Sequence, residues 1–331
     1  MGSSFFTTSW VGIFLAQSFF HSLIAAVIVD RSLAVWDIRT PLIRQRFRSL
    51  ILFLPLVSLP LYHSLTPNRT AFTFRTEALF DSSRWLGLEL WSALPLHFFL
   101  LLILVLTALL FLLQEFLPIL KHALAPEKSP REGAKPLPGS PAFAASESLN
   151  AVKPDIYVIH DTDPILLSTT GASASIFLST GLIEALDEEQ LRGALAHEIA
   201  HIQRNRKPLL ILLFVLRVLL FFNPVVLLEF RRIVREEERI CDDIAVSLTG
   251  NSRALSEALR KLHPHTGLFS RMPGKTLVQA KASLEEYGHA LQLDTRIRRL
   301  EQGEAGKDTG SHWLPLGMTA LAVVLINYFV V

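Results

Sequence analysis

Two histidines and a glutamate form the pattern H-E-x-x-H at His197, Glu198 and His201. On an α-helix, side chains four residues apart lie on one face, so His197 and His201 could hold a single metal ion between them. Glu198 points about 100° round the helix, which places it beside the metal and not on it. A carboxylate there could act as the general base for a water molecule that zinc activates. Such a short pattern also arises by chance, and two histidines leave a zinc site incomplete.

The helix that would carry this pattern can be predicted from its flanks. Asp187 is followed three residues later by Gln190, a capping box that predicts a helix from Asp187 to about Arg204. Short runs of β-branched and aromatic residues predict two strands before it, at 156–159 and 175–178.

The second predicted strand has two interpretations. It could be an ordinary strand of the domain core. It could also bind an extended peptide through its backbone, as peptides add to sheet edges. In that case the substrate-binding residues would be Ile176, Phe177 and Leu178.

A zinc site of this type needs a third protein ligand and leaves one position for water. The charged stretch from Glu229 to Asp243 should be helical, and its candidate ligands are all carboxylates: Glu236, Glu237, Glu238, Asp242 and Asp243. Glu238 and Asp242 are four residues apart and share a face. One could bind the metal while the other accepts a hydrogen bond from a ligand imidazole and fixes its tautomer. The alternative is a solvated, charged helix face.

The composition indicates a membrane protein with one soluble domain. The chain is 50% hydrophobic and only 19% charged, its mean hydropathy is +0.37, and a soluble protein has about 25% charged residues. Four apolar runs predict membrane spans: Phe5–Val29, Leu50–Leu65, Leu86–Ile119 and Trp313–Val331. The net charge of +2 is too small to argue for nucleic acid as a partner. The single cysteine, Cys241, excludes an intrachain disulfide framework and suits a reducing compartment.

The loop charges predict an orientation. Five arginines lie in the segment 30–49, whereas the first nine residues have no charged side chain. By the positive-inside rule the N-terminus lies outside and residues 121–312 lie in the cytoplasm. The arginines Arg296, Arg298 and Arg299, before the last span, would then anchor at a membrane surface.

These observations predict a domain order. Residues 1–124 would form a three-helix transmembrane region, residues 125–150 a flexible linker rich in Pro, Ser, Ala and Gly, residues 151–311 a cytoplasmic domain, and residues 312–331 the last transmembrane helix. Within the cytoplasmic domain, residues 208–228 are strongly apolar until Asn223-Pro224 interrupts them. They are either a buried core helix or a re-entrant or interfacial segment at the bilayer.

The motifs together resemble a known family. LAHEIAHIQRNR, then FNPVV, then EERICDDIAV are similar to the BlaR/MecR antirepressor type of integral-membrane zinc metallopeptidase. Those enzymes pair H-E-x-x-H with a downstream Glu-x-x-Cys-Asp segment, which Glu238-Arg239-Ile240-Cys241-Asp242 fits. The resemblance implies Glu238 as the third ligand and Asp242 as the partner of a ligand imidazole. Its firm motif matches run from His197 to Asp242.

The resemblance also implies a fold and an activity. The expected fold is an α-helical membrane protein with a cytoplasmic α+β zincin-like (gluzincin) metalloprotease domain, in a bacterial inner membrane. The expected function is regulatory, zinc-dependent cleavage of a cytoplasmic or membrane-proximal protein or peptide, with one Zn²⁺ per chain, the lipid bilayer as a further partner, and a homo-oligomer left open. No segment fits the penicillin-binding sensor domain of the antibiotic receptors, so β-lactam sensing is not implied.

Two alternatives remain. CAAX prenyl proteases and HtpX-type quality-control peptidases have a similar Glu-x-x-Ala-Asp segment, and Cys241 in place of alanine favours the antirepressor type. A protein of another class, a membrane scaffold or sensor with a structural zinc, would not need Glu198 as a base. The donor that stabilises the oxyanion is unassigned, and its candidates are Tyr157, His160, His263, His265 and Tyr287.

Overall fold

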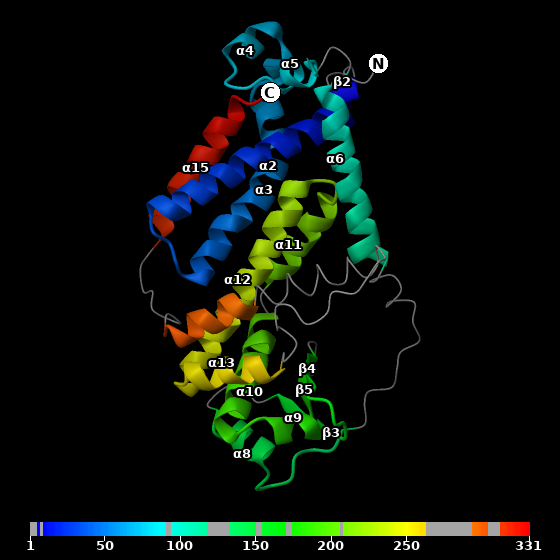
Figure 1. Cartoon of the computed structure of the whole chain (residues 1–331). Helices are drawn as coiled ribbons and strands as arrows, with labels where there is room; N and C mark the ends of the chain where they lie inside the picture. Colours follow the sequence, from blue (N-terminus) through cyan, green and yellow to red (C-terminus); the bar gives the residue numbers. More distant parts are fainter. Residues whose placement is uncertain are drawn as a thin grey trace. The chain divides into compact units, whose positions relative to one another are not determined.

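The computed structural model describes residues 5–6, 9–90, 94–117, 133–149, 154–169, 174–205, 208–262, 293–303 and 312–331 (Figure 1). The chain divides into two compact units. The first comprises Met1–Pro126, Leu209–Glu236 and Thr309–Val331, and the second comprises Glu127–Pro208 and Glu237–Asp308. Helix α12 (Pro224–Thr249) contributes its first half to the first unit and its second half to the second unit.

The first unit is built from apolar helices. They are α2 (Trp10–Val35), α3 (Pro41–Leu65), α6 (Leu96–Phe111), α11 (Pro208–Leu219) and α15 (Trp313–Tyr328). Between α3 and α6 lie η1 (Pro67–Thr70), α4 (Phe72–Glu77), α5 (Ser82–Leu86) and the antiparallel pair β1 (Glu89–Leu90) and β2 (Leu94–Pro95). A π-helical turn, η2 (Leu112–Phe116), continues α6. Helix α15 packs against both α2 and α3.

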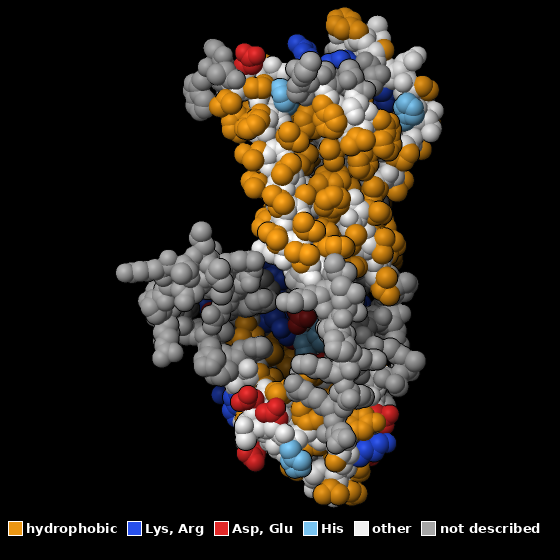
Figure 2. Space-filling model, turned by 90° about the vertical axis from the view of Figure 1, so that its right-hand side faces the viewer, with side chains coloured by type: hydrophobic (Ala, Val, Ile, Leu, Met, Phe, Trp, Pro, Cys, Tyr) orange, Lys and Arg blue, Asp and Glu red, His pale blue; other side chains and the backbone are white. Residues whose placement is uncertain are grey.

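Three of these helices are long and apolar enough to cross a membrane: α2, α3 and the combined segment Leu96–Phe116. Hydrophobic side chains cover the face of this unit seen in Figure 2. Among the exposed large hydrophobic residues are Phe98, Leu102, Leu106 and Leu110 of α6. Exposed apolar surface of this extent is what lipid-facing helices present, and the helices support an integral membrane protein.

The limits of the predicted spans need correction. Helix α3 begins at Pro41, so that arginines expected in the first loop lie on the helix. The third apolar helix begins at Leu96 and not at Leu86, because Gly87 ends α5 and a β-hairpin intervenes. The last apolar helix has 16 residues and is shorter than the other three.

Residues 209–236 pack with the apolar helices. Leu213, Leu216, Leu220 and Val226 are buried in the same hydrophobic cluster as residues of α2, α3 and α6. The segment is therefore not a core helix of the peptidase domain, which was one of its two interpretations. The hairpin that α11 forms with the first half of α12 belongs to the unit of apolar helices.

Asn223 holds the tip of this hairpin. Its Oδ1 accepts hydrogen bonds from the backbone N–H groups of Val225 and Val226, at 3.0 and 3.5 Å, and so caps α12. Its Nδ2 donates to the backbone oxygen of Ser18 at 3.1 Å and to Ser22 Oγ at 3.2 Å, both on α2. One fully buried side chain thus satisfies a helix end and joins two helices.

Ion pairs hold the first half of α12 against α3. Arg48 Nη1 lies 2.7 Å from Glu229 Oε2, and both side chains are buried. Arg44 Nε, one turn before Arg48 on α3, lies 3.0 Å from Glu236 Oε1, about two turns after Glu229 on α12. Because removing one partner of a buried pair leaves an uncompensated charge, these contacts fix the register of the two helices.

The second unit combines a small sheet with helices. Strand β5 (Ser175–Ser179) is central, with β3 (Asp155–Ile159) parallel to it on one side and β4 (Leu166–Thr169) antiparallel on the other. The helices are α8 (Pro141–Glu147), α9 (Thr180–Ala185), α10 (Glu188–Asn205), the second half of α12, α13 (Ser252–Leu262) and residues 293–301. The two predicted strands and the predicted helix through H-E-x-x-H are confirmed.

Part of the predicted flexible linker is ordered. Residues 118–132 lie outside the described residues, but Ala134 pairs with Val158 at the edge of β3. Ser140 caps α8, whose Ala142 and Ala145 are buried in the core of the unit. The small residues that suggested flexibility are small because α8 packs closely against α10.

Replacing Asn223 by alanine should destabilise the protein by about 2 kcal/mol, because a cap is lost and the Ser18 carbonyl loses a buried donor. Asn251→Ala is the matched control, since Asn251 Oδ1 caps α13 through Ala254 N without joining α13 to a buried polar group. Thermal unfolding of the detergent-solubilised chain measures both. Equal losses for the two variants would contradict the joining role of Asn223.

Candidate metal centre

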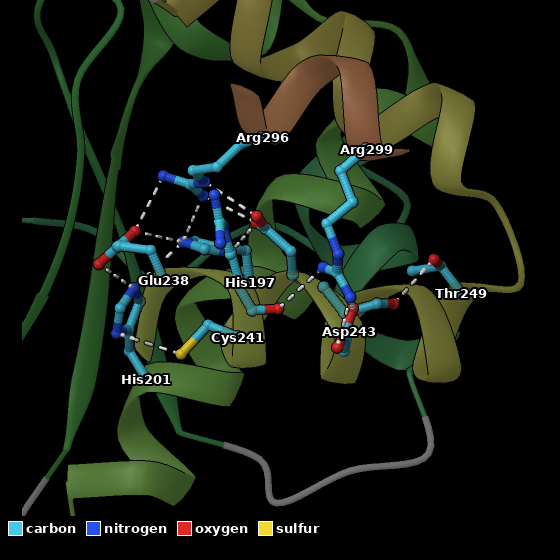
Figure 3. Close-up of polar contacts among 11 residues, drawn as sticks. His197, His201, Glu238, Cys241, Asp243, Thr249, Arg296 and Arg299 are labelled. Carbon is cyan, nitrogen blue, oxygen red and sulfur yellow. Dashed lines mark hydrogen bonds and ion pairs between the residues drawn. The ribbon is translucent and has the colours of Figure 1, made fainter. Parts of the chain in front are cut away.

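Helix α10 brings the two histidines of the motif together. The Nε2 atoms of His197 and His201 lie 3.1 Å apart (Figure 3). The capping box predicted for this helix forms, because Gln190 N donates to Asp187 Oδ1 at 2.9 Å and Asp187 N donates to Gln190 Oε1 at 3.3 Å. The opposite face of α10 is buried in the core of the unit through Leu195, Ala196 and Ile199, among others. Burial of that face turns both imidazoles toward α12.

Glu238 on α12 completes the cluster. Its Oε2 lies 3.6 Å from His197 Nε2 and its Oε1 lies 3.5 Å from His201 Nε2. Among the described residues, these three form the group whose ligand atoms lie close enough together to share a metal ion, within 4.8 Å of one another.

The spacing of the ligand atoms is compatible with zinc. Two ligand atoms at about 2.0–2.1 Å from a tetrahedral zinc ion lie about 3.4 Å from each other. The two Nε2 atoms, 3.1 Å apart, are close to this separation, and each Nε2 lies at a similar distance from a different oxygen of Glu238, 3.6 Å for Oε2 and 3.5 Å for Oε1. Two imidazoles and one carboxylate are also a donor set of catalytic zinc sites that keep one position open.

The other nitrogen of each imidazole also has a neighbour. His197 Nδ1 lies 3.1 Å from Asp242 Oδ1, and the Asp242 side chain is 1% exposed. His201 Nδ1 lies 3.4 Å from the sulfur of Cys241. A carboxylate at Nδ1 holds the ring proton there and leaves the Nε2 lone pair free for a metal. Burial raises the pKa of the Cys241 thiol, so Cys241 is protonated at neutral pH in the metal-free protein.

The electrostatics of the site favour negative carboxylates. Burial raises the pKa of Asp242 and Glu238, but Arg296 and His197 outweigh burial and hold both pKa values below their usual range. Burial lowers the pKa of His197, yet Asp242 and Glu238 raise it to about 9. Burial and the neighbouring His197 lower the pKa of His201. A metal that binds His197 Nε2 at neutral pH would therefore release a proton.

The other acidic residues of α12 are engaged elsewhere. Glu236 pairs with Arg44 in the first unit. Glu237 pairs with Arg204, whose Nε and Nη2 both lie 2.6 Å from its carboxylate oxygens. Asp243 Oδ1 lies 2.7 Å from Arg299 Nη2. The five carboxylates left open by the sequence are thereby sorted, with Glu238 toward the two imidazole Nε2 atoms and Asp242 behind His197.

A cavity of about 260 Å³ opens at this cluster. Glu198, His197, His201 and Glu238 line it together with apolar residues: Leu166, Leu255, Leu259 and Leu262. Glu198 is half-buried at the cavity wall, next to the metal ligands and outside the ligand cluster. This is the place that a general base requires.

The expected role of β5 in substrate binding is wrong. Strand β5 lies between β3 and β4 and its backbone is hydrogen-bonded on both sides, so Ile176, Phe177 and Leu178 cannot pair with an added peptide. Ile176 and Leu178 are fully buried in the core. In the described part of the sheet the edge nearer the cavity belongs to β4, whose Leu166 lines it.

Arg296 is the residue of the site that the sequence did not reveal. It was expected at a membrane surface, but its guanidinium contacts Glu238, Asp242 and His197. Arg299 is likewise paired, with Asp243, and only Arg298 is strongly exposed. The sequence offered one signal for this role. Arg296 and Arg299 are three residues apart and so share a helix face, which could have been matched with the acidic pair Asp242 and Asp243.

Of the candidate oxyanion donors, the two that the structure describes do not line the cavity. Tyr157 on β3 stacks on Phe177, with ring centroids 5.3 Å apart, and neither it nor His160 lines the cavity. His263, His265 and Tyr287 lie outside the described residues.

The chain combines the His197–His201–Glu238 cluster, the carboxylate of Glu198 beside it, and three helices long enough to cross a membrane. This combination is typical of a membrane metallopeptidase. Residues 149–286 match the family model described as BlaR1 peptidase M56. The resemblance to the BlaR/MecR type, inferred from the motifs, is confirmed for this segment, which is a peptidase M56 domain.

Relatives named as HtpX proteases match a shorter stretch. The protease HtpX homolog of Thermoanaerobacter pseudethanolicus is 40% identical over 60 residues, which are 18% of this chain and 20% of the relative. The homolog of Aquifex aeolicus is 41% identical over 59 residues, 17% of this chain and 19% of the relative. The chain thus spans about a fifth of the length of these relatives. No solved structure matches the chain significantly.

The assignment of Glu238 can be tested against its neighbours. Glu238→Gln should lower zinc affinity at least ~100-fold, beyond the usual effect of losing a group that only orients a ligand. Glu236→Gln and Glu237→Gln are the matched controls and should keep one zinc per folded chain, because their partners are arginines. Elemental analysis of the purified variants decides. Full zinc in Glu238→Gln with loss in either control would contradict the assignment.

Proposed function

We propose that the protein is a membrane-embedded, zinc-dependent endopeptidase that cleaves a cytoplasmic or membrane-proximal protein. The observation that carries the proposal is the position of Glu198, in the wall of the cavity beside the His197–His201–Glu238 cluster. A metal site that only held the fold would need no carboxylate at that place.

His197, His201 and Glu238 would hold the zinc ion. When bound, zinc polarises a peptide carbonyl and makes water more acidic. The carboxylate of Glu198 accepts the proton of the attacking water and then donates it to the departing amine. Asp242 keeps the proton of His197 on Nδ1, so that Nε2 presents its lone pair to the ion.

A peptide substrate would be held in an extended form. Strand β4 forms an edge of the described sheet, and Leu166 at its start lines the cavity. Backbone hydrogen bonds to an edge strand bind a peptide without selecting its side chains. The apolar wall formed by Leu255, Leu259 and Leu262 would then favour an apolar side chain near the cleaved bond.

The apolar helices of the first unit support a membrane setting. We propose a bacterial inner membrane, with the peptidase domain in the cytoplasm as the loop arginines predict, and a zincin-like fold for that domain. Support for a hairpin among the membrane helices comes from the packing of residues 209–236 with them.

The test of the proposed function is Glu198→Gln. This change should keep zinc and fold but reduce cleavage by at least ~10²–10⁴-fold, because the proton acceptor is lost. Glu188→Gln, in the first turn of the same helix, is the control and should cleave as wild type does. The measurement compares protein fragments in cells that express each variant.

The same comparison separates the alternatives. A regulatory peptidase of the BlaR/MecR type would leave one or a few intact substrates in the Glu198→Gln cells. A quality-control peptidase of the HtpX type would leave many. Identical fragments in wild-type and Glu198→Gln cells would refute the enzyme and favour a scaffold with a structural zinc.

A further inference from the structure

Arg296 reaches into the ligand cluster from the helix formed by residues 293–301. Its Nη1 donates to Glu238 Oε2 at 2.9 Å. Its Nε and Nη2 donate to the two carboxylate oxygens of Asp242 at 2.8 and 2.7 Å. Its Nη2 also lies 3.4 Å from His197 Nε2, an atom that would bind the metal. The guanidinium therefore forms a hydrogen bond with Glu238, lies near His197, and binds both oxygens of Asp242, the residue behind His197.

These contacts affect stability because water has little access to the three side chains. The side chain of Arg296 is 14% exposed, that of Glu238 34% and that of Asp242 1%. Other arginines already occupy the nearby carboxylates, with Arg204 at Glu237 and Arg299 at Asp243. Without Arg296, the carboxylates of Glu238 and Asp242 would face one another across His197, and one imidazole cannot compensate both negative charges. An uncompensated buried charge is strongly destabilising.

We propose that Arg296 is an internal cation that stands in for the metal. In the metal-free protein it neutralises Glu238 and Asp242 and keeps the ligands in the geometry of the site. When a divalent cation binds, Arg296 competes with it for the charge of Glu238. The inference rests on the metal site of the proposed function and adds a positioning residue that sets metal affinity.

The direction of the effect follows from a thermodynamic cycle. Arg296 stabilises the metal-free state more than the metal-bound state, because in the bound state the ion itself neutralises Glu238 and also repels the guanidinium. Removing Arg296 should therefore weaken the fold without metal and tighten the binding of metal. A residue that merely held the ligands in place would give the opposite result, with weaker metal binding after its removal.

The experiment uses the full chain in detergent, with and without zinc. For Arg296→Gln the unfolding midpoint without metal should fall by about 10 °C, and the rise on adding zinc should exceed that of wild type. Zinc affinity, measured by competition with a chelator, should be at least about tenfold tighter than in wild type. Arg299→Gln is the matched control on the same helix. It removes the pair with Asp243, and its zinc affinity should equal that of wild type.

Arg296→Lys keeps the charge without the guanidinium fork and should show a zinc-induced rise within the wild-type range. The Arg296→Lys variant also tests the inference if Arg296→Gln cannot be purified with or without zinc. Zinc affinity of Arg296→Gln equal to or weaker than wild type, or a larger zinc-induced rise in Arg296→Lys, would overturn the inference alone. A wild-type protein whose midpoint does not respond to zinc would overturn the metal site and the proposed function with it.

Discussion

Neutralisation of the carboxylates of α12 is the constraint on which the rest of the structure depends. Six acidic residues fall between Glu229 and Asp243 on this helix. Most of them meet an arginine from another element: Glu229 meets Arg48, Glu236 meets Arg44, Glu237 meets Arg204, and Asp243 meets Arg299. Glu238 and Asp242 face the imidazoles and share Arg296. Buried carboxylates without a cation would be costly, so these partners decide where the helix can pack.

Polar groups also have partners among the apolar helices of the first unit. Several charged and polar groups in that unit are paired with one another. Arg217 of α11 is fully buried, with Nη2 3.2 Å from Glu115 Oε1 and its guanidinium carbon 4.8 Å from the centre of the Phe111 ring. Asn223 makes four hydrogen bonds at the hairpin tip. Unpaired polar groups are costly in an apolar setting, so these contacts specify how the hairpin meets its neighbours.

Much of the site could be predicted from local sequence. A capping box and an i, i+4 pair of histidines are both local signals, and α10 formed as expected. Local sequence could not predict which carboxylate of α12 binds the metal. That assignment depends on which carboxylates pair with arginines, and these lie 33 to 192 residues away along the chain. The resemblance supplied Glu238 and Asp242, and the pairing of Glu236 and Glu237 supplies the physical reason. Arg296 escaped prediction for the same reason, since it lies 54 residues from Asp242.

The sheet and the apolar runs show a second limit. The pattern of Ser175–Leu178 correctly predicted a strand, but alternation does not tell a central strand from an edge strand. Short β4 went unpredicted, and it is β4 that makes β5 central. Hydropathy placed the apolar runs but not their ends, because Gly87 and the β1–β2 hairpin are turn features inside an apolar stretch. Residues 140–149 read as a linker because tight packing and flexibility both favour small side chains.

The central claim is a zinc ion held by two imidazoles and one carboxylate, with Cys241 nearby as a neutral thiol. X-ray absorption spectroscopy at the zinc edge of the purified full chain tests it most directly. The account predicts two imidazole ligands and oxygen ligands at about 2.0–2.2 Å, with no sulfur in the coordination sphere. A zinc–sulfur distance of about 2.3 Å, or fewer than two imidazoles, would contradict it.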